Sequence, residues 1–382
     1  MSDTVMIIAG EASGELYGAL LAHELKKIRS TVDIIGIGGI RMKEAGVELI
    51  SGITSSFGLT EVFSSLWEIR KSYKRASDAL RHFRPNVLVL IDYPEFNLRL
   101  AQEAKKQGIQ ILYYVSPQVW AWRRKRIRTI AQRVDRMAVI LPFEEDLYKN
   151  VHLNAEFVGH PVFDEIQKMR KDKGMCKKDL EINEDEPLLS LLPGSRPNEI
   201  KKLLPVIVEV IREFRKTYKD FRFCVPFAHN TNLEAYAAFI ADLEQEGVII
   251  NKGKALGVLS VSDAAVIASG TAALQAAFLG VPIVVIYKLS PLTFWIGKLM
   301  VKVHYISLVN ILSGRTVIRE LIQNNVTTDH IMNELRKIIE QKHYRESILQ
   351  AYDALQNQFS GKHASRRTAQ IVAEMAGWSM NR

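Results

Sequence analysis

Short apolar runs alternate with amphipathic stretches along most of the chain. In the first 160 residues, five such runs predict β-strands at residues 5–9, 34–37, 87–91, 111–115 and 137–140. Because these runs are continuously apolar, both faces of each strand should be covered, which is typical of a parallel sheet between helices. The pattern then starts again, with strands predicted at residues 188–192, 223–226, 248–250, 264–267 and 283–286.

The two sets of strands predict two α/β domains in tandem. A polar, charge-rich segment at residues 168–187 separates them, and 382 residues exceed what one hydrophobic core usually supports. We therefore expect a first domain over residues 1–168 and a second over 169–340. Residues 341–382 should form helices that could pack back on the first domain.

Composition narrows the class of protein only in part. The chain is 47% hydrophobic and 24% charged, and its net charge of +9 suits a polyanionic partner: nucleic acid, an anionic bilayer surface or a phosphorylated substrate. Two cysteines, Cys176 and Cys224, indicate neither a disulfide framework nor a metal cluster, so we expect a reduced, cytoplasmic setting. No apolar run approaches the ~20 residues that a membrane-crossing helix needs.

Two strand ends in the second half carry turns of small residues, Leu191-Leu-Pro-Gly-Ser-Arg196 and Ala268-Ser-Gly-Thr-Ala-Ala-Leu-Gln275. Such turns let backbone N–H groups and helix N-termini approach a diphosphate. Arg196 adds a forked cation for phosphate oxygens, with a surface salt bridge as the alternative role. Ser269, Gly270 and Thr271 supply N–H groups and a helix cap. The two turns predict a site for a nucleoside-diphosphate sugar.

Polar motifs also follow the strands of the first half. Gly10-Glu-Ala-Ser-Gly-Glu15 follows the first strand, where Glu11 and Ser13 could hydrogen-bond a sugar, or Ser13 could simply cap the next helix. Asp92 and Glu95 follow the third strand. A partly buried carboxylate there would suit a general base, whereas the alternative has Asp92 anchoring the loop and Glu95 solvated.

Six motifs occur in the order in which they are found in one bacterial glycosyltransferase family. They lie at residues 10–15, 91–97, 114–123, 192–196, 268–274 and 307–312, and together the chain resembles the lipid-A-disaccharide synthase family from Ile8 to about Glu320. The resemblance implies two facing Rossmann-like domains of the GT-B type. It also implies an inverting transfer from UDP-2,3-diacylglucosamine to 2,3-diacylglucosamine 1-phosphate, which forms a β-1,6-linked disaccharide and UDP.

The resemblance assigns roles to individual residues. It implies that Asp92 or Glu95 is the catalytic base, although the family usually has Asp at the position of Glu95. Gln275 stands where related transferases often have a ribose-binding Glu. Asn310, from the last motif, would face the cleft or would act as a structural amide. With no Asp-X-Asp triplet in the sequence, and with His160 isolated, the expected catalysis needs neither metal nor cofactor.

Because its expected substrates are acylated, the enzyme should act at the inner-membrane surface. Val62, Phe63, Leu66, Ile69 and Tyr73 recur at helical spacing beside basic residues, which suits either an interfacial helix or a core face. A second apolar stretch covers residues 293–303, and the cations at 123–126 and 128 could bind a phosphate or anionic headgroups or form a solvated helix face. We expect a cytoplasmic, peripherally bound enzyme without a nucleic-acid partner, and leave a homodimer open.

Four alternatives to this interpretation differ in class. Another GT-B transferase for UDP-sugars or a UDP-sugar epimerase would share the nucleotide-binding domain but would lack an apolar groove for the acyl chains of the acceptor. A nucleotide-dependent oxidoreductase is weaker, because no Gly-X-Gly-X-X-Gly follows a predicted strand. A basic nucleic-acid-binding protein would explain the net charge but not the paired phosphate turns.

Overall fold

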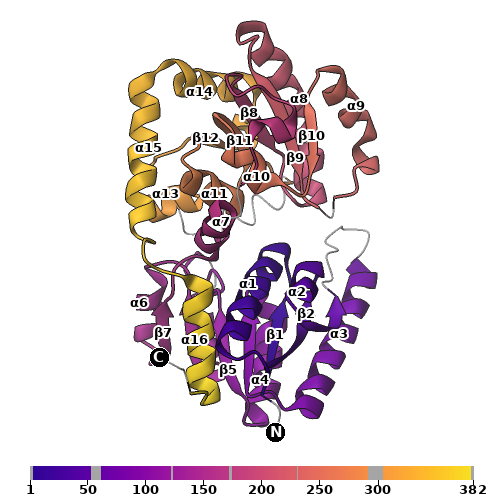
Figure 1. Ribbon diagram of the computed structural model, residues 1–382, viewed down its shortest axis with the longest axis vertical. Coiled ribbons are helices and arrows are strands. Elements are labelled where there is room, and N and C mark those ends of the chain that lie inside the picture. Colours follow the sequence, from indigo (N-terminus) through magenta and orange to yellow (C-terminus); the bar gives the residue numbers. More distant parts are fainter. Residues whose placement is uncertain are drawn as a thin grey trace. The chain divides into compact units, whose positions relative to one another are not determined.

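The computed structural model describes residues 3–52, 62–121, 124–171, 174–229, 231–290 and 304–379. The chain forms two compact units, one of Met1–Asp164 with Gly361–Arg382 and one of Glu165–Ser360 (Figure 1). These bounds differ from the sequence-based ones. The first unit ends before residue 168, and the predicted C-terminal segment is divided, because helix α15 (Lys342–Asn357) groups with the second unit and helix α16 (Ala364–Ala376) with the first.

The first unit contains a seven-stranded parallel sheet in the order β3-β2-β1-β4-β5-β6-β7. Its strands are β1 (Thr4–Ala9), β2 (Asp33–Gly38), β3 (Glu48–Gly52), β4 (Val87–Ile91), β5 (Gln110–Tyr114), β6 (Arg136–Val139) and β7 (Asn154–Phe157). Its helices are α1 (Ala12–Ile28), α2 (Ile40–Glu44), α3 (Val62–Phe83), α4 (Pro94–Lys106), α5 (Arg126–Arg133), α6 (Glu144–Lys149) and α16, and α7 (Pro161–Lys171) begins here.

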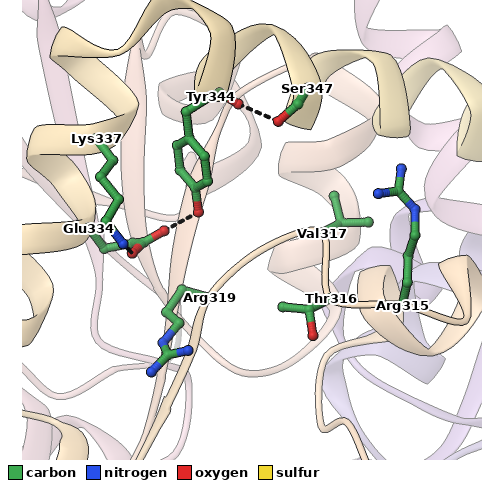
Figure 2. A pocket seen from close by; sticks show the side chains of 8 residues that line it. All are labelled: Arg315, Thr316, Val317, Arg319, Glu334, Lys337, Tyr344 and Ser347. Atoms are coloured by element: carbon green, nitrogen blue, oxygen red, sulfur yellow. Dashed lines mark hydrogen bonds and ion pairs between the residues drawn. The ribbon is translucent and has the colours of Figure 1, made fainter.

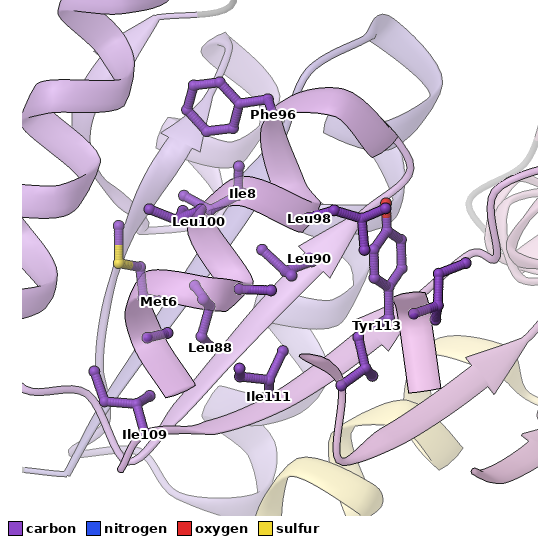
Figure 3. Packing of buried hydrophobic residues seen from close by; sticks show 14 of the residues in the cluster. Met6, Ile8, Leu88, Leu90, Phe96, Leu98, Leu100, Ile109, Ile111 and Tyr113 are labelled. Carbon is purple, nitrogen blue, oxygen red and sulfur yellow. The ribbon is translucent and has the colours of Figure 1, made fainter. Parts of the chain in front are cut away.

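The continuous apolar strands of this sheet are covered on both faces, as predicted. On one face, Leu88 and Leu90 of β4 pack with Phe96 and Leu100 of α4 in a buried cluster (Figure 3). On the other face, α16 lies beside α1 and contacts β4 and β5 (Figure 1). Every residue of β1 and β4 is buried, which explains why their sequences lack polar alternation.

The second unit contains a six-stranded parallel sheet in the order β10-β9-β8-β11-β12-β13. Its strands are β8 (Leu188–Leu192), β9 (Arg222–Phe227), β10 (Ile249–Lys252), β11 (Ala264–Ala268), β12 (Ile283–Tyr287) and β13 (Glu320–Ile322). Its helices are most of α7, then α8 (Pro197–Thr217), α9 (Ala237–Gln245), α10 (Ala255–Ser260), α11 (Thr271–Leu279), α13 (Leu308–Ser313), α14 (Thr328–Glu340) and α15, with 3₁₀ turns at Lys177–Leu180, Glu234–Tyr236 and Gln323–Asn325.

The two sheets share one feature that locates a binding site. In each, the strand order reverses between two neighbouring central strands, β1 and β4 in the first unit and β8 and β11 in the second. Open α/β sheets bind ligands at the carboxyl ends of such strand pairs, because the following loops diverge there. The registers Ala9 to Ile91 and Leu192 to Ile267 bring the strand ends together in each pair. The polar motifs predicted from the sequence follow these four strands.

Candidate active site

The turn after β4 has an unusual backbone at Asp92 and Tyr93. Asp92 and Tyr93 have φ angles of +47° and +45°, a left-handed conformation that costs ~1–3 kcal/mol for a non-glycine residue. The buried amide of Asn97 donates to the Asp92 carbonyl at 2.6 Å and to the Ile91 carbonyl at 3.2 Å, and the Tyr113 hydroxyl also donates to the Asp92 carbonyl. Three hydrogen bonds from two neighbouring side chains therefore hold a strained turn, and the Asp92 side chain lies half-buried at the switch point.

Asp92 and Glu95 occupy different environments. The Glu95 side chain is 65% exposed and forms an ion pair with Arg126 of α5. Asp92 is half-buried and lies closer to the strand end. Partial burial strengthens electrostatic interactions of a carboxylate, whereas an exposed ion pair is well screened by water.

The loop after β1 lies against the same turn. A Cβ atom added at Gly10 would lie 2.4 Å from Cγ of Tyr93, so a side chain at this position would displace the tyrosine ring. Tyr93 in turn stacks on Phe96 at 5.3 Å between ring centroids. The glycine of the predicted motif is therefore required by the close approach of two loops.

Glu11 and Ser13 lie at the N-terminus of α1. The helix begins at Ala12, with Glu11 as its N-cap residue, and no side chain caps it. The alternative that Ser13 caps this helix is therefore wrong. Both side chains are half-buried, and both follow β1 at the switch point of the first unit.

In the second unit, the turn after β8 presents Arg196. Gly194 has φ +104°, and a Cβ atom there would lie 2.5 Å from the Glu199 carboxylate, so glycine is needed. Arg196 is the N-cap residue of α8. Its side chain is 61% exposed, and its guanidinium lies 3.8 Å from the Glu199 carboxylate.

The turn after β11 brings a helix N-terminus to the same switch point. Gly270 is the N-cap residue of α11 in an extended conformation, and no atom lies within 4 Å of where its Cβ would be. Ser269 donates from its hydroxyl to the Ile306 carbonyl at 3.4 Å, and Thr271 begins the helix. The backbone N–H groups of this first turn carry the positive end of the helix dipole.

Two lysines near the second switch point were not predicted from the sequence. Lys202 lies on α8, and Lys288 directly follows β12. Burial lowers the pKa of Lys202, and the positive charge of Lys288 lowers it further. Two cations close enough to repel one another would stabilise a bound dianion.

Gln275 and Asn310 both form hydrogen bonds inside the second unit. The Gln275 amide donates to the Glu165 carboxylate at 2.9 Å. Asn310 is fully buried; its amide nitrogen donates to the Ile318 carbonyl and Glu320, and its oxygen accepts from two backbone N–H groups. This geometry is that of the structural amide, since all four hydrogen-bonding positions of Asn310 are used within the protein.

One surface cavity lies away from both switch points. It has a volume of about 240 Å³ and lies at the amino end of β13 (Figure 2). Its lining residues are Arg315, Thr316, Val317, Arg319, Glu334, Lys337, Tyr344 and Ser347. Because all strands of this sheet are parallel, the cavity is at the opposite edge from the turns after β8 and β11. It contains none of the predicted site residues.

Metal sites and membrane-crossing helices were sought among the residues that the structure describes. Within those residues, no group of three or more His, Cys, Asp or Glu side chains could hold a metal ion. No helix in the described ranges is long and apolar enough to cross a membrane. Cys176 and Cys224 are both free thiols. The apolar stretch at 293–303 and residues Trp122 and Arg123 lie outside the described part of the chain.

Two doubly wound parallel sheets in tandem are the architecture of the GT-B fold. Solved structures share this fold: UDP-GlcNAc 2-epimerase from Neisseria meningitidis bound to UDP-GlcNAc (TM-score 0.70, 14% identity, 97% of this chain and 100% of that chain) and the glycotransferase of kitacinnamycin (TM-score 0.65, 14% identity, 98% and 99%). At such identities the likeness concerns the fold alone, and it confirms the predicted fold class.

Sequence relatives settle the family. The family model described as lipid-A-disaccharide synthetase matches residues 5–375. Lipid-A-disaccharide synthase from Syntrophus aciditrophicus is 40% identical over 370 residues, covering 96% of each chain, and that from Geobacter sulfurreducens is 38% identical over 379 residues, covering 98% of each. The chain belongs to the lipid-A-disaccharide synthase family. It is a glycosyltransferase that forms the lipid A disaccharide, as the sequence motifs predicted.

Proposed function

We propose that the enzyme joins UDP-2,3-diacylglucosamine to 2,3-diacylglucosamine 1-phosphate with inversion, and that each switch point has one role in the reaction. The first unit binds the acceptor and supplies the base. The second unit binds the UDP part of the donor. The observation that carries this proposal is the division of residue types, because the half-buried carboxylate is at the first switch point and the phosphate-type turns are at the second.

Asp92 is the base in this proposal. Its carboxylate takes the proton of the acceptor 6-hydroxyl as that oxygen attacks the anomeric carbon of the donor. The bond from this carbon to UDP breaks, and UDP leaves with the electron pair, so attack from the opposite face inverts the α-linkage to β. Asp92 is preferred to Glu95 because Glu95 is mostly exposed and paired with Arg126, whereas the Asp92 turn is held by Asn97 and Tyr113.

The departing diphosphate is stabilised in the second unit. The N-terminal N–H groups of α11, from Gly270 and Thr271, and the guanidinium of Arg196 bind its oxygens, with the Ser269 hydroxyl beside them. Gln275 lies one turn along α11 and offers its carbonyl to the ribose, while its N–H bonds Glu165. Asn310 acts indirectly by holding the segment before β13. Glu11 and Ser13 contact the acceptor sugar.

Helix α3 is the proposed contact with the inner-membrane surface. Trp67 is 64% exposed, and the ammonium of Lys71 lies 5.0 Å from its ring centroid. Arg70, Lys74 and Arg75 are exposed on the same helix. An exposed indole beside cations favours the interface of an anionic bilayer, where acylated substrates are found. Cosedimentation with anionic vesicles should weaken several-fold in Trp67→Ala, and unchanged cosedimentation would contradict this contact. Light scattering would measure whether the chain forms the homodimer that the sequence analysis left open.

Product analysis tests the reaction itself. Defined acylated donor and acceptor are incubated with the full chain, and mass spectrometry with NMR of the anomeric proton identifies the product. A β-1,6 disaccharide 1-phosphate that requires both substrates is expected. UDP release at the same rate without acceptor would contradict transfer. An epimerised donor would favour the UDP-sugar epimerase alternative, whose fold this chain shares.

A further inference from the structure

The first unit holds a second carboxyl group that the proposed mechanism does not use. Glu144 begins α6, just after β6, and only 1% of it is exposed. Glutamate is almost never buried to this extent unless its carboxyl group has partners or a function. No sequence motif distinguished it from its neighbours Glu145 and Asp146.

Hydrogen bonds from two segments converge on this carboxyl group. One oxygen accepts the indole N–H of Trp120 at 3.1 Å, and the other accepts the backbone N–H of Leu141 at 3.1 Å. The Trp120 ring also meets Phe143 edge-on, with 5.2 Å between ring centroids. Glu144 therefore fixes both the position and the orientation of the indole.

Trp120 belongs to the loop that follows β5. A second contact ties the start of this loop to α6, since Ser116 and the Tyr148 hydroxyl are 2.6 Å apart. Strands β4, β5 and β6 are neighbours in the sheet, so the loops after them lie side by side at the carboxyl edge. The loop held by Glu144 is therefore next to the turn that carries Asp92.

Electrostatics connect the two carboxyl groups. Burial raises the pKa of Glu144 to about 8, and the negative charge of Asp92 contributes to the rise. The raised pKa favours the neutral form of Glu144, which lessens the negative charge close to Asp92. Neighbouring carboxyl groups whose environments separate their pKa values commonly have different roles in one site.

We propose that Glu144 is a positioning residue for the acceptor: it holds the Trp120 indole as a fixed wall beside Asp92, against which the acceptor sugar is oriented. This inference rests on the proposed function of the first unit. Fixing the acceptor matters because a misplacement of ~1 Å can reduce the rate about 10²-fold. Glu144 acts through Trp120 and takes no proton in the reaction.

A double-mutant cycle tests the proposal with Glu144→Ala, Trp120→Phe and the pair. Trp120→Phe keeps an aromatic ring but loses the N–H that Glu144 accepts. Each single variant should raise the acceptor KM about tenfold while the donor KM and UDP affinity stay at wild-type values. The double variant should be no worse than the more damaging single variant, because each single variant already removes the same hydrogen bond between Trp120 and Glu144. Glu144→Gln, which keeps one carbonyl acceptor, should recover part of the loss.

The control is Asp146→Ala, an exposed acid on the same helix, which should behave as wild type. Thermal melting identifies any variant that fails to fold. Losses that multiply in the double variant, equal increases in donor and acceptor KM, or wild-type kinetics in Trp120→Phe would each overturn the positioning role. Absence of any disaccharide from the wild-type enzyme would instead reject the proposed function, so the two failures are distinguishable.

Discussion

The two switch points have the same topology but opposite chemistry. In the first unit, the loops after β1 and β4 carry Glu11 and Asp92, and the backbone at Asp92 is left-handed. In the second, the loops after β8 and β11 carry Arg196, Gly270 and a helix N-terminus. One sheet architecture can therefore present an anionic site or a cationic one, because the sheet sets only the position and the loops set the charge.

Removing the carboxylate at the first switch point should have the largest effect. Asp92→Asn is expected to reduce kcat ~10² to 10⁴-fold, which is typical for loss of a general base, with UDP affinity unchanged. Glu95→Gln is the matched control and should lose less than tenfold, because Glu95 is exposed and paired with Arg126. Steady-state kinetics and UDP titration calorimetry provide the measurements. Full turnover in Asp92→Asn would show that the base lies elsewhere.

Removing the guanidinium at the second switch point should weaken UDP binding, which Asp92→Asn leaves unchanged. Arg196→Ala should weaken UDP binding ~10- to 100-fold, since hydrogen bonds to charged groups contribute ~1.5–3 kcal/mol. Lys201→Ala removes an exposed cation of the same helix and should leave the Kd nearly unchanged. Equal losses in the two variants would point to general electrostatic attraction instead of a contact at the turn.

Asn310 tests whether a residue of the second unit stabilises the fold or contacts UDP directly. Asn310→Ala leaves buried N–H and C=O groups without partners, so the free energy of unfolding should fall by ~2–4 kcal/mol. UDP affinity, measured at a temperature where the variant stays folded, should fall less than in Arg196→Ala. Urea denaturation and calorimetry check the two quantities. A stable variant with lost UDP binding would make Asn310 a direct ligand.

Glu144 should make the stability of the first unit depend on pH. Its pKa is raised to about 8 from 4.5, so the native state holds a proton that the unfolded chain has lost between these values. Its contribution therefore lowers stability as pH rises, by up to ~1.4 kcal/mol per pH unit, and levels off above pH 8. Urea unfolding of wild type and Glu144→Gln between pH 5 and 8 should show this slope in the difference. Parallel curves would mean that Glu144 is ionised at neutral pH.

The sequence predicted the parts of the fold that local pattern determines. All ten predicted strands are present, because a short, continuously apolar run such as Val87–Ile91 is typical of a strand that is buried on both faces. The strands β3, β7 and β13 were missed because they are short and partly exposed, so their apolar pattern is weak. The division between α15 and α16 depends on packing between distant segments, which no local pattern encodes.

The candidate site divides in the same way. Gly194 and Gly270 could be predicted because the turns that they form have a sequence signature. Glu144, Lys202 and Lys288 could not, since each becomes notable only through burial or through a neighbour from another element. The full use of the Asn310 amide was equally invisible, because its partners lie on a loop several residues away.

A crystal structure of the full chain with bound UDP would show which switch point binds the pyrophosphate. The pyrophosphate is expected at the turns after β8 and β11, with its oxygens bound by the α11 N-terminus and Arg196, while the carboxylate turn at Asp92 holds no phosphate. Pyrophosphate density against the turn after β4, or in the cavity lined by Arg315 and Arg319, would contradict it.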